Sequence, residues 1–161
     1  MQKVISLLME NQAGALSRVV GLFSQRGYNI DSLIVAPTSD PTVSRLTMTT
    51  QEEERVVRQI IKQVNKLIDV VKVKDLTGIN LIDRELLLIK VAISKRNKNL
   101  LKKLNCSILS EENKLLVAEF VGTSAEVDKI ILKLKNCPLL EVVRTGVSGI
   151  SSDEKIFSVR G

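Results

Sequence analysis

Apolar and polar residues in the first half of the chain alternate with strand-like and helix-like periods. The apolar run at residues 4–9 predicts a buried strand. Residues 14–25 place their apolar side chains on one helical face, which predicts an amphipathic helix, and Gly27 suits the left-handed conformation that ends many helices. The apolar positions on that face are Leu16, Val19, Val20 and Phe23.

The next four elements complete a recognisable order. Residues 29–36 predict a second strand that Pro37 ends, and the alternation at residues 45–49 predicts a half-exposed third strand. Thr50 and Glu53 have the spacing of a capping box that opens a second helix, and residues 71–74 alternate as a fourth strand. The order strand, helix, strand, strand, helix, strand predicts a ferredoxin-like βαββαβ fold with both helices on one face of an antiparallel sheet.

The second half repeats this order. Residues 86–93, 106–109, 115–121 and 139–143 predict strands, residues 97–104 predict a short basic helix, and residues 111–113 predict a turn. Thr123 and Glu126 have the spacing of a second capping box. We therefore predict an α+β protein with two ferredoxin-like βαββαβ domains, at residues 1–78 and 79–161. Residues 76–84 read as a connection, and we expect the polar tail from Gly149 to be loosely held.

Each predicted domain leaves one face of its sheet without a helix layer. Domains of about 75 residues have small cores, and sheet faces and edges that remain exposed need partners. Pairing of like halves between two chains supplies such partners. We therefore expect at least a homodimer.

Composition excludes several classes of function. The formal net charge is +6, but the basic residues are spread over both halves and aromatic residues make up only 2% of the chain, which argues against a nucleic-acid partner. Histidine is absent, so the commonest general base and zinc ligand is missing. Cys106 and Cys137 are widely spaced, which favours buried thiols over a zinc site or a disulfide. No apolar run is long enough to cross a membrane, and we expect a cytoplasmic protein, with the plastid as the alternative.

Two turns around the first helix form a candidate site for a small zwitterion. The first helix begins just after Asn11 and Gly14, and the N–H groups of its first turn attract a carboxylate. Gly14 permits close approach because it has no Cβ. Asn29 opens the second strand and offers both a donor and an acceptor, as Asn11 does. Leu16 and Ile30 supply an apolar wall.

Spacing alone leaves structural explanations open for these residues. Asn11 could only shape the turn, Gly14 could only ease the helix entry, and Asn29 could only satisfy a turn amide. An amino acid of about eight heavy atoms needs ~1 kcal/mol per atom to bind at micromolar affinity, which is near the ceiling for small ligands. An enclosed site is therefore required, and a dimer interface between corners of two chains would enclose it.

A long motif resembles a known family. Residues 10–48, ENQAGALSRVVGLFSQRGYNIDSLIVAPTSDPTVSRLTM, closely resemble the amino-terminal domain of the small regulatory subunits of acetolactate synthase, also called acetohydroxyacid synthase. The second half is similar more weakly, in VAEFVGTSAEVDKI and EVVRTGVSGISSDEKI. The resemblance implies an amino-terminal ACT domain, which binds amino acids at interfaces, and a carboxyl-terminal ACT-like domain.

The resemblance also implies a function and a partner. It implies a non-catalytic subunit of branched-chain amino acid biosynthesis that activates a large catalytic subunit and confers feedback inhibition by valine. No cofactor is expected on this chain, whereas thiamine diphosphate, magnesium and flavin adenine dinucleotide are expected on the large subunit. The family's valine-site positions match Asn11, Gly14 and Asn29. The candidate valine-binding residues are Asn11, Ala13, Gly14, Ala15, Leu16, Asn29 and Ile30.

Two other functions compete with this interpretation. A free-standing ACT-domain amino-acid sensor or transcriptional regulator would need a DNA-reading element, and the sequence has no helix-turn-helix stretch. An enzyme in its own right would need a nucleophile and a base. The acidic groups at residues 52–54 and 111–112 instead occupy a helix start and a turn, where charge is favoured for structural reasons.

Overall fold

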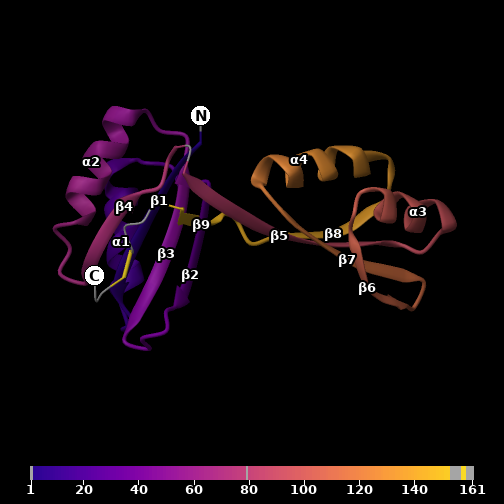
Figure 1. Cartoon of the computed structure of the whole chain (residues 1–161), viewed down its shortest axis with the longest axis horizontal. Helices are drawn as coiled ribbons and strands as arrows, with labels where there is room; N and C mark the ends of the chain where they lie inside the picture. The colour runs from indigo at the N-terminus through magenta and orange to yellow at the C-terminus, as the bar shows by residue number, and fades with distance from the viewer. Residues whose placement is uncertain (1, 79, 153–156, 159–161) are drawn as a thin grey trace. The chain divides into compact units, whose positions relative to one another are not determined.

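The structure is a computed structural model that describes residues 2–78, 80–152 and 157–158 (Figure 1). The chain forms two compact units, one of Met1–Ile82 with Val147–Gly161 and one of Asp83–Gly146. The chain therefore leaves the first unit after Ile82 and returns to it at Val147. The sequence placed the domain boundary beside residue 79, which lies outside the described residues, and assigned the whole carboxyl-terminal segment to the second half.

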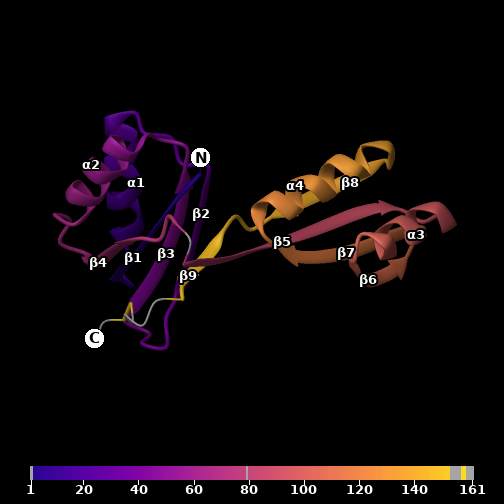
Figure 2. The same cartoon turned by 45° about the horizontal axis from the view of Figure 1, so that its top comes forward.

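The first unit is a four-stranded antiparallel sheet with two helices on one face. Its elements are β1 (Lys3–Glu10), α1 (Ala15–Arg26), β2 (Ser32–Pro37), β3 (Val43–Thr50), α2 (Glu54–Val64) and β4 (Val70–Asp75). The strand order is β2-β3-β1-β4. Figures 1 and 2 both show α1 and α2 on the same side of this sheet. The predicted βαββαβ fold of the first half is confirmed.

Inward side chains of the two central strands form the core under the helices. Ile5 of β1 lies opposite Met48 of β3, and Leu7 lies opposite Leu46. All four are fully buried. The helices add Ala15, Val19, Phe23, Val57, Ile60 and Val64 to the same cluster. Of the four apolar positions predicted for the core face of α1, Val19 and Phe23 are buried, Val20 is half-buried and Leu16 is 38% exposed, so the prediction is confirmed only in part.

The predicted end of α1 is confirmed, whereas the predicted start of α2 is wrong. Gly27 is left-handed (φ 67°, ψ 23°) and its N–H donates to the carbonyls of Phe23 and Ser24, so the predicted end of α1 is confirmed. The predicted capping box at Thr50 is wrong, because Thr50 ends β3 and α2 begins at Glu54. The Thr50 hydroxyl instead donates to the carbonyl of Asn29, at 2.7 Å, and so fastens the turn before β2.

The second unit repeats the architecture. Its elements are β5 (Leu81–Ala92, which begins in the first unit), α3 (Lys95–Lys103), β6 (Ser107–Glu112), β7 (Leu115–Gly122), α4 (Ser124–Lys133), a 3-10 turn (Leu134–Asn136) and β8 (Leu139–Arg144). The strand order is β6-β7-β5-β8. The capping box of Thr123 and Glu126 is confirmed at the start of α4. The two-domain α+β prediction therefore holds for the second half as well.

In the second half, two local predictions are wrong and the prediction for the two cysteines is confirmed. Residues 81–84 belong to β5 rather than to a connection, and residues 111–112 belong to β6. The turn that follows is made by Asn113 and Lys114, both with positive φ, as a two-residue hairpin requires. Cys106 and Cys137 are buried free thiols, as predicted. No helix in the described part of the chain combines the length and apolar character that a membrane span requires.

Residues 147–151 return from the second unit and pack on the helix-free face of the first sheet. The strand β9 (Ser148–Ser151) pairs with β5. Val147 is 1% exposed and packs with Val4, Leu76 and Leu81. Its N–H donates to the Ser32 hydroxyl at 3.4 Å. The loosely held tail was predicted from Gly149, whereas residues 149–151 lie in β9. Residues 153–156 and 159–161 of that tail lie outside the described residues.

Burial of Val147 predicts that the returning segment, residues 147–151, stabilises the first unit. Val147→Ala removes two buried methyl groups and should lower the free energy of unfolding by about 1.5–3 kcal/mol. Tyr28 is the only tyrosine in a chain without tryptophan, and it packs against the first unit's core, so its fluorescence during urea unfolding reports on this unit. Val71→Ala is the control, because Val71 of β4 is 42% exposed. Equal urea midpoints for Val147→Ala and Val71→Ala would contradict a stabilising role for Val147.

Candidate functional site

The turn between β1 and α1 is opened by a glycine in a left-handed conformation. Gly14 occupies the N-cap of α1 with φ 86° and ψ −17°, a region that residues with a Cβ rarely adopt. The N-cap makes no side-chain hydrogen bond to the first turn of α1, and the Ala15 N–H donates to the Gln12 carbonyl at 3.3 Å. Ala15 is fully buried beneath this turn and Leu16 is 38% exposed beside it. The turn therefore presents backbone donors and a short apolar wall to a small anion.

Asn11 fastens this turn to the loop between β2 and β3. Its backbone N–H donates to the Thr42 carbonyl at 2.8 Å. Its side-chain amide donates to the Pro41 carbonyl at 2.9 Å. Asn11 itself is exposed. One side-chain N–H is thus used for structure, and the amide oxygen accepts no hydrogen bond from the described residues.

A buried carboxylate that the sequence did not single out anchors the turn from below. Asp69 is 1% exposed and lies directly before β4. It accepts hydrogen bonds from Arg18 Nε at 2.5 Å and Nη2 at 2.7 Å. It also accepts one from Gln12 Nε2 at 2.9 Å, and its backbone carbonyl accepts one from the Glu10 N–H at 2.8 Å. The end of β1, the turn and the first turns of α1 therefore share one anchor.

The same contacts explain the charge state of the pair. The hydrogen bonds from Arg18 lower the pKa of Asp69 from its ordinary value of 3.8 to about 2, against the opposing effect of burial. The hydrogen bond to Asp69 raises the pKa of Arg18 in turn. The only hint in the sequence is a lone acid between apolar residues, at Ile68-Asp69-Val70. That pattern does not reveal its partners, because Gln12 and Arg18 are more than fifty residues away.

Asn29 and Ile30 lie at the other end of the sheet from Asn11. Thr49 of β3 pairs with Val4 of β1 on one side and with Ser32 of β2 on the other. The strands β1 and β2 therefore start at the same end of the sheet, with β3 between them. Asn11 follows the far end of β1. Seven residues of strand at about 3.3 Å each separate the two corners by roughly 20 Å. A single chain therefore brings Asn11, Ala13, Gly14, Ala15 and Leu16 together and does not bring Asn29 and Ile30 to them.

The corner that holds Asn29 has its own hydrogen bonds. The Asn29 side-chain amide donates to Asp31 Oδ1 at 2.8 Å, and its backbone N–H donates to Glu52 Oε1 at 3.4 Å. Its carbonyl accepts from the Thr50 hydroxyl. The Asn29 side chain is exposed. Both asparagines are thus held by their backbones and present side-chain amides at the surface.

A cavity of about 480 Å³ extends from Gly14 along the outer side of α1. Its other lining residues are Ser17, Arg18, Gly21, Leu22, Gln25 and Leu67. Small side chains at three positions of this helix face leave space beside the turn. The cavity is open toward solvent on this chain.

The fold of the first unit is that of an ACT domain. Residues 5–72 match the family model described as an AHAS small subunit-like ACT domain. Residues 84–153 match the model described as the small subunit of acetolactate synthase. The chain belongs to the family of acetolactate synthase small subunits, and the resemblance seen in the sequence is confirmed.

Individual relatives agree along nearly the whole chain. The acetolactate synthase isozyme 3 small subunit of Escherichia coli is 42% identical, with 98% of this chain and 99% of that protein covered. The acetolactate synthase small subunit of Bacillus subtilis is 35% identical, with 94% and 91% covered. The crystal structure of the small subunit from Thermotoga maritima superimposes with a TM-score of 0.87 at 29% identity, covering 94% of this chain and 97% of that one. The similarity therefore includes both units.

The ion pair between buried Asp69 and half-exposed Arg18 predicts a defined dependence of stability on pH. The pKa of Asp69 is depressed to about 2, so the stability that its charge contributes is present above about pH 4 and is lost as the pH falls toward 2. Asp69→Asn should therefore lower the free energy of unfolding at neutral pH. Its difference from the wild type should shrink between about pH 4 and pH 2. Urea unfolding followed by Tyr28 fluorescence measures both effects.

Asp31→Asn is the matched control for this measurement. Asp31 is an exposed carboxylate of the same unit and its partner is the Asn29 side chain. Its replacement should change stability little at any pH. If the two variants behave alike at neutral pH, Asp69 does not anchor the turn.

Proposed function

We propose that the chain is the non-catalytic regulatory subunit that activates the large catalytic subunit of acetolactate synthase and confers feedback inhibition by valine. Membership of the small-subunit family over both units supports the regulatory role. The observation that carries the valine site is the start of α1, where Gly14 leaves the first turn without a side-chain cap. The chain has no histidine and so lacks the commonest general base, which is consistent with a partner that carries the chemistry.

The catalytic chemistry belongs to the large subunit in this proposal. Thiamine diphosphate, magnesium and flavin adenine dinucleotide are bound there and not by this chain. The small subunit then acts by changing the equilibrium between more and less active arrangements of the complex. Valine has an effect only if it binds the two arrangements with different affinity, and such coupling is typically ~1–3 kcal/mol.

Valine binding follows from the chemistry of the turn. The carboxylate of the ligand accepts hydrogen bonds from the first N–H groups of α1, with Gly14 permitting close approach. The ammonium group donates to a side-chain amide oxygen, of which Asn11 offers one. The isopropyl group packs on Leu16, which is 38% exposed on this chain. Ala13 and Ala15 complete the turn without obstructing it.

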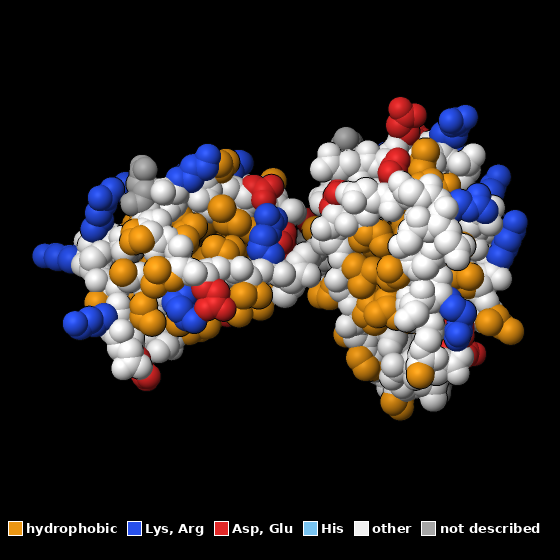
Figure 3. Space-filling view, turned by 180° about the vertical axis from the view of Figure 1, so that it is seen from behind, with side chains coloured by type: hydrophobic (Ala, Val, Ile, Leu, Met, Phe, Trp, Pro, Cys, Tyr) orange, Lys and Arg blue, Asp and Glu red, His pale blue; other side chains and the backbone are white. Residues whose placement is uncertain are grey.

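Two chains are needed to complete this site. Asn29 and Ile30 lie roughly 20 Å from Asn11 in one chain, as the strand register requires. A two-fold related copy can place its Asn29 corner against the Asn11 corner of the first chain, and the same contact is then made twice. The second unit supports a homodimer independently, because Val121 and Val143 are 56% and 47% exposed on its helix-free sheet face. Figure 3 shows hydrophobic side chains gathered on that unit.

Single substitutions should separate valine binding from activation. Asn11→Ala, Gly14→Asp and Asn29→Ala should abolish valine inhibition while the large subunit remains activated. Gly14→Asp strains a backbone with φ 86°, brings a Cβ to within 3.0 Å of Arg18 Nη1, and opposes the ligand carboxylate with a like charge. Calorimetric titration of the wild type with valine should show about one site per chain.

Asn99→Ala is the control for these variants, because Asn99 is an exposed asparagine on α3 in the other unit. Leucine and alanine serve as ligand controls. Retained valine inhibition in Asn29→Ala would contradict the shared site. Simultaneous loss of activation and inhibition in all three variants would indicate misfolding, which Tyr28 fluorescence would reveal.

Mixing two inactive variants tests whether the site is shared between chains. In a dimer of one Asn11→Ala chain and one Asn29→Ala chain, one of the two sites has both native asparagines and the other has neither. Random reassortment after unfolding and refolding together should therefore restore about one quarter of the valine sites. If the mixture refolds to dimers but no valine sites return, the proposed shared site is wrong. Either both asparagines then belong to a site within one chain, or one of them does not bind valine.

A further inference from the structure

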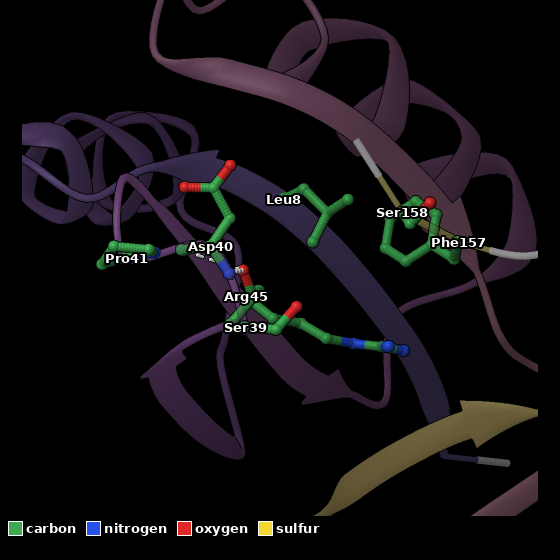
Figure 4. Close-up of a pocket in the computed structure, with 8 residues that line it drawn as sticks. Leu8, Ser39, Asp40, Pro41, Arg45, Phe157 and Ser158 are labelled. Carbon is green, nitrogen blue, oxygen red and sulfur yellow. Dashed lines mark hydrogen bonds between the residues drawn. The ribbon is translucent and has the colours of Figure 1, made fainter. Parts of the chain in front are cut away.

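A second cavity lies in the first unit, beneath the end of the chain. Its volume is about 640 Å³, within the range of small-ligand sites. It is walled by the loop between β2 and β3 and by the returning segment (Figure 4). The lining residues are Leu8, Thr38, Ser39, Asp40, Pro41, Arg45, Phe157 and Ser158. The proposed valine site uses none of them as ligands.

Arg45 is the cationic residue among those that line this cavity, and the described residues satisfy only part of its guanidinium. Its Nε donates to the Ser6 hydroxyl at 3.0 Å, and its Nη2 donates to the Gly149 carbonyl at 2.9 Å. The ring of Phe157 lies 5.3 Å from the guanidinium carbon. A guanidinium has five N–H donors, so three are left over from these two bonds. None of the carboxylates in the described residues forms an ion pair with it.

The surroundings make this an unusual place for an unpaired cation. Arg45 is half-buried, and burial lowers its pKa. A charge removed from water is costly unless an opposite charge or several hydrogen bonds replace the lost hydration. The Lys72 ammonium donates to the Ser158 carbonyl on the wall of the same cavity, at 2.6 Å, and so fixes that wall. The site is therefore electrostatically suited to an anion.

The remaining groups indicate where an anion lies. Asp40 accepts hydrogen bonds at Oδ1 from the Thr42 backbone and hydroxyl, and it would repel an anion from its own end. In Figure 4 the Arg45 guanidinium extends away from Asp40 toward Phe157 and Ser158, and Ser39 lies beside the Arg45 side chain. Ser39 is exposed and offers a hydroxyl donor. Leu8, Pro41 and Phe157 offer apolar contact for the body of a ligand.

We propose that this cavity binds a small oxyanion, either a short-chain carboxylate or a phosphate group, through the free N–H donors of Arg45. A carboxylate accepts two parallel N–H bonds from a guanidinium, and a phosphate oxygen pair does so equally well. The site is separate from the valine turn and does not depend on the proposed regulatory function.

Binding is tested on the full chain by NMR titration at constant chloride concentration, with two probes in separate arms. Propionate represents a carboxylate with an apolar end, and inorganic phosphate represents the phosphate group. Saturable shifts should appear at the Arg45 Nε–H and at the Ser39 and Asp40 amides. Saturation by only one probe identifies the source of the oxyanion, and saturation by both identifies a general oxyanion site.

Two variants and a control make the test specific. Arg45→Gln removes the charge, and Ser39→Glu supplies an internal carboxylate from an exposed position; each should weaken binding about tenfold or more. Arg58→Gln should bind as the wild type does, because Arg58 is exposed on α2 and pairs with Glu54. No saturable shift with either probe, or equal affinity in a folded Ser39→Glu variant, would overturn the proposal.

Discussion

The buried carboxylate of Asp69 is the interaction on which the candidate site depends. It binds Arg18 through two nitrogens and Gln12 through one, and its own carbonyl receives the N–H of Glu10. A charge that is 1% exposed is tolerable only because these donors replace its hydration. With Asp69 beneath it, the turn between β1 and α1 holds its backbone donors in place before a ligand arrives.

Much of the fold could be predicted because it depends on neighbours in sequence. The alternation at residues 45–49, the helical spacing from Leu16 to Phe23 and the capping box at Thr123 each involve residues a few positions apart. Thr50 shows where this reasoning fails, since its hydroxyl has a capping spacing but donates to Asn29 across the sheet edge. The return of Val147 to the first unit and the partners of Asp69 are contacts over many tens of residues, and no local pattern encodes them.

The candidate site divides in the same way. Asn11, Gly14 and Asn29 are visible in the sequence because turns need such residues, and the motif at residues 10–48 points to them a second time. Their separation within one chain follows only from the register, which places Ser32 beside Thr49 and Val4. In the order β2-β3-β1-β4, β1 and β2 both run antiparallel to β3 and hence in the same direction. The last residue of β1 and the first residue of β2 therefore lie at opposite ends of the sheet. If the two corners hold one ligand, as we propose, a second chain has to supply one of them, and dimerisation is then part of ligand recognition.

One loop joins the two cavities of the first unit. Pro41 accepts a hydrogen bond from Asn11 in the β1–α1 turn, and the same residue lines the cavity of Arg45. β1 also contributes to both sides of the sheet, because Leu7 packs in the core under the helices while Leu8 lines the cavity of Arg45. A displacement of Pro41 by an occupant of either site must therefore stretch or bend its hydrogen bond to Asn11. By linkage, any effect of one occupant on the affinity for the other is reciprocal. The hydrogen bond between the Asn11 side chain and the Pro41 carbonyl is a direct contact between the two proposed sites.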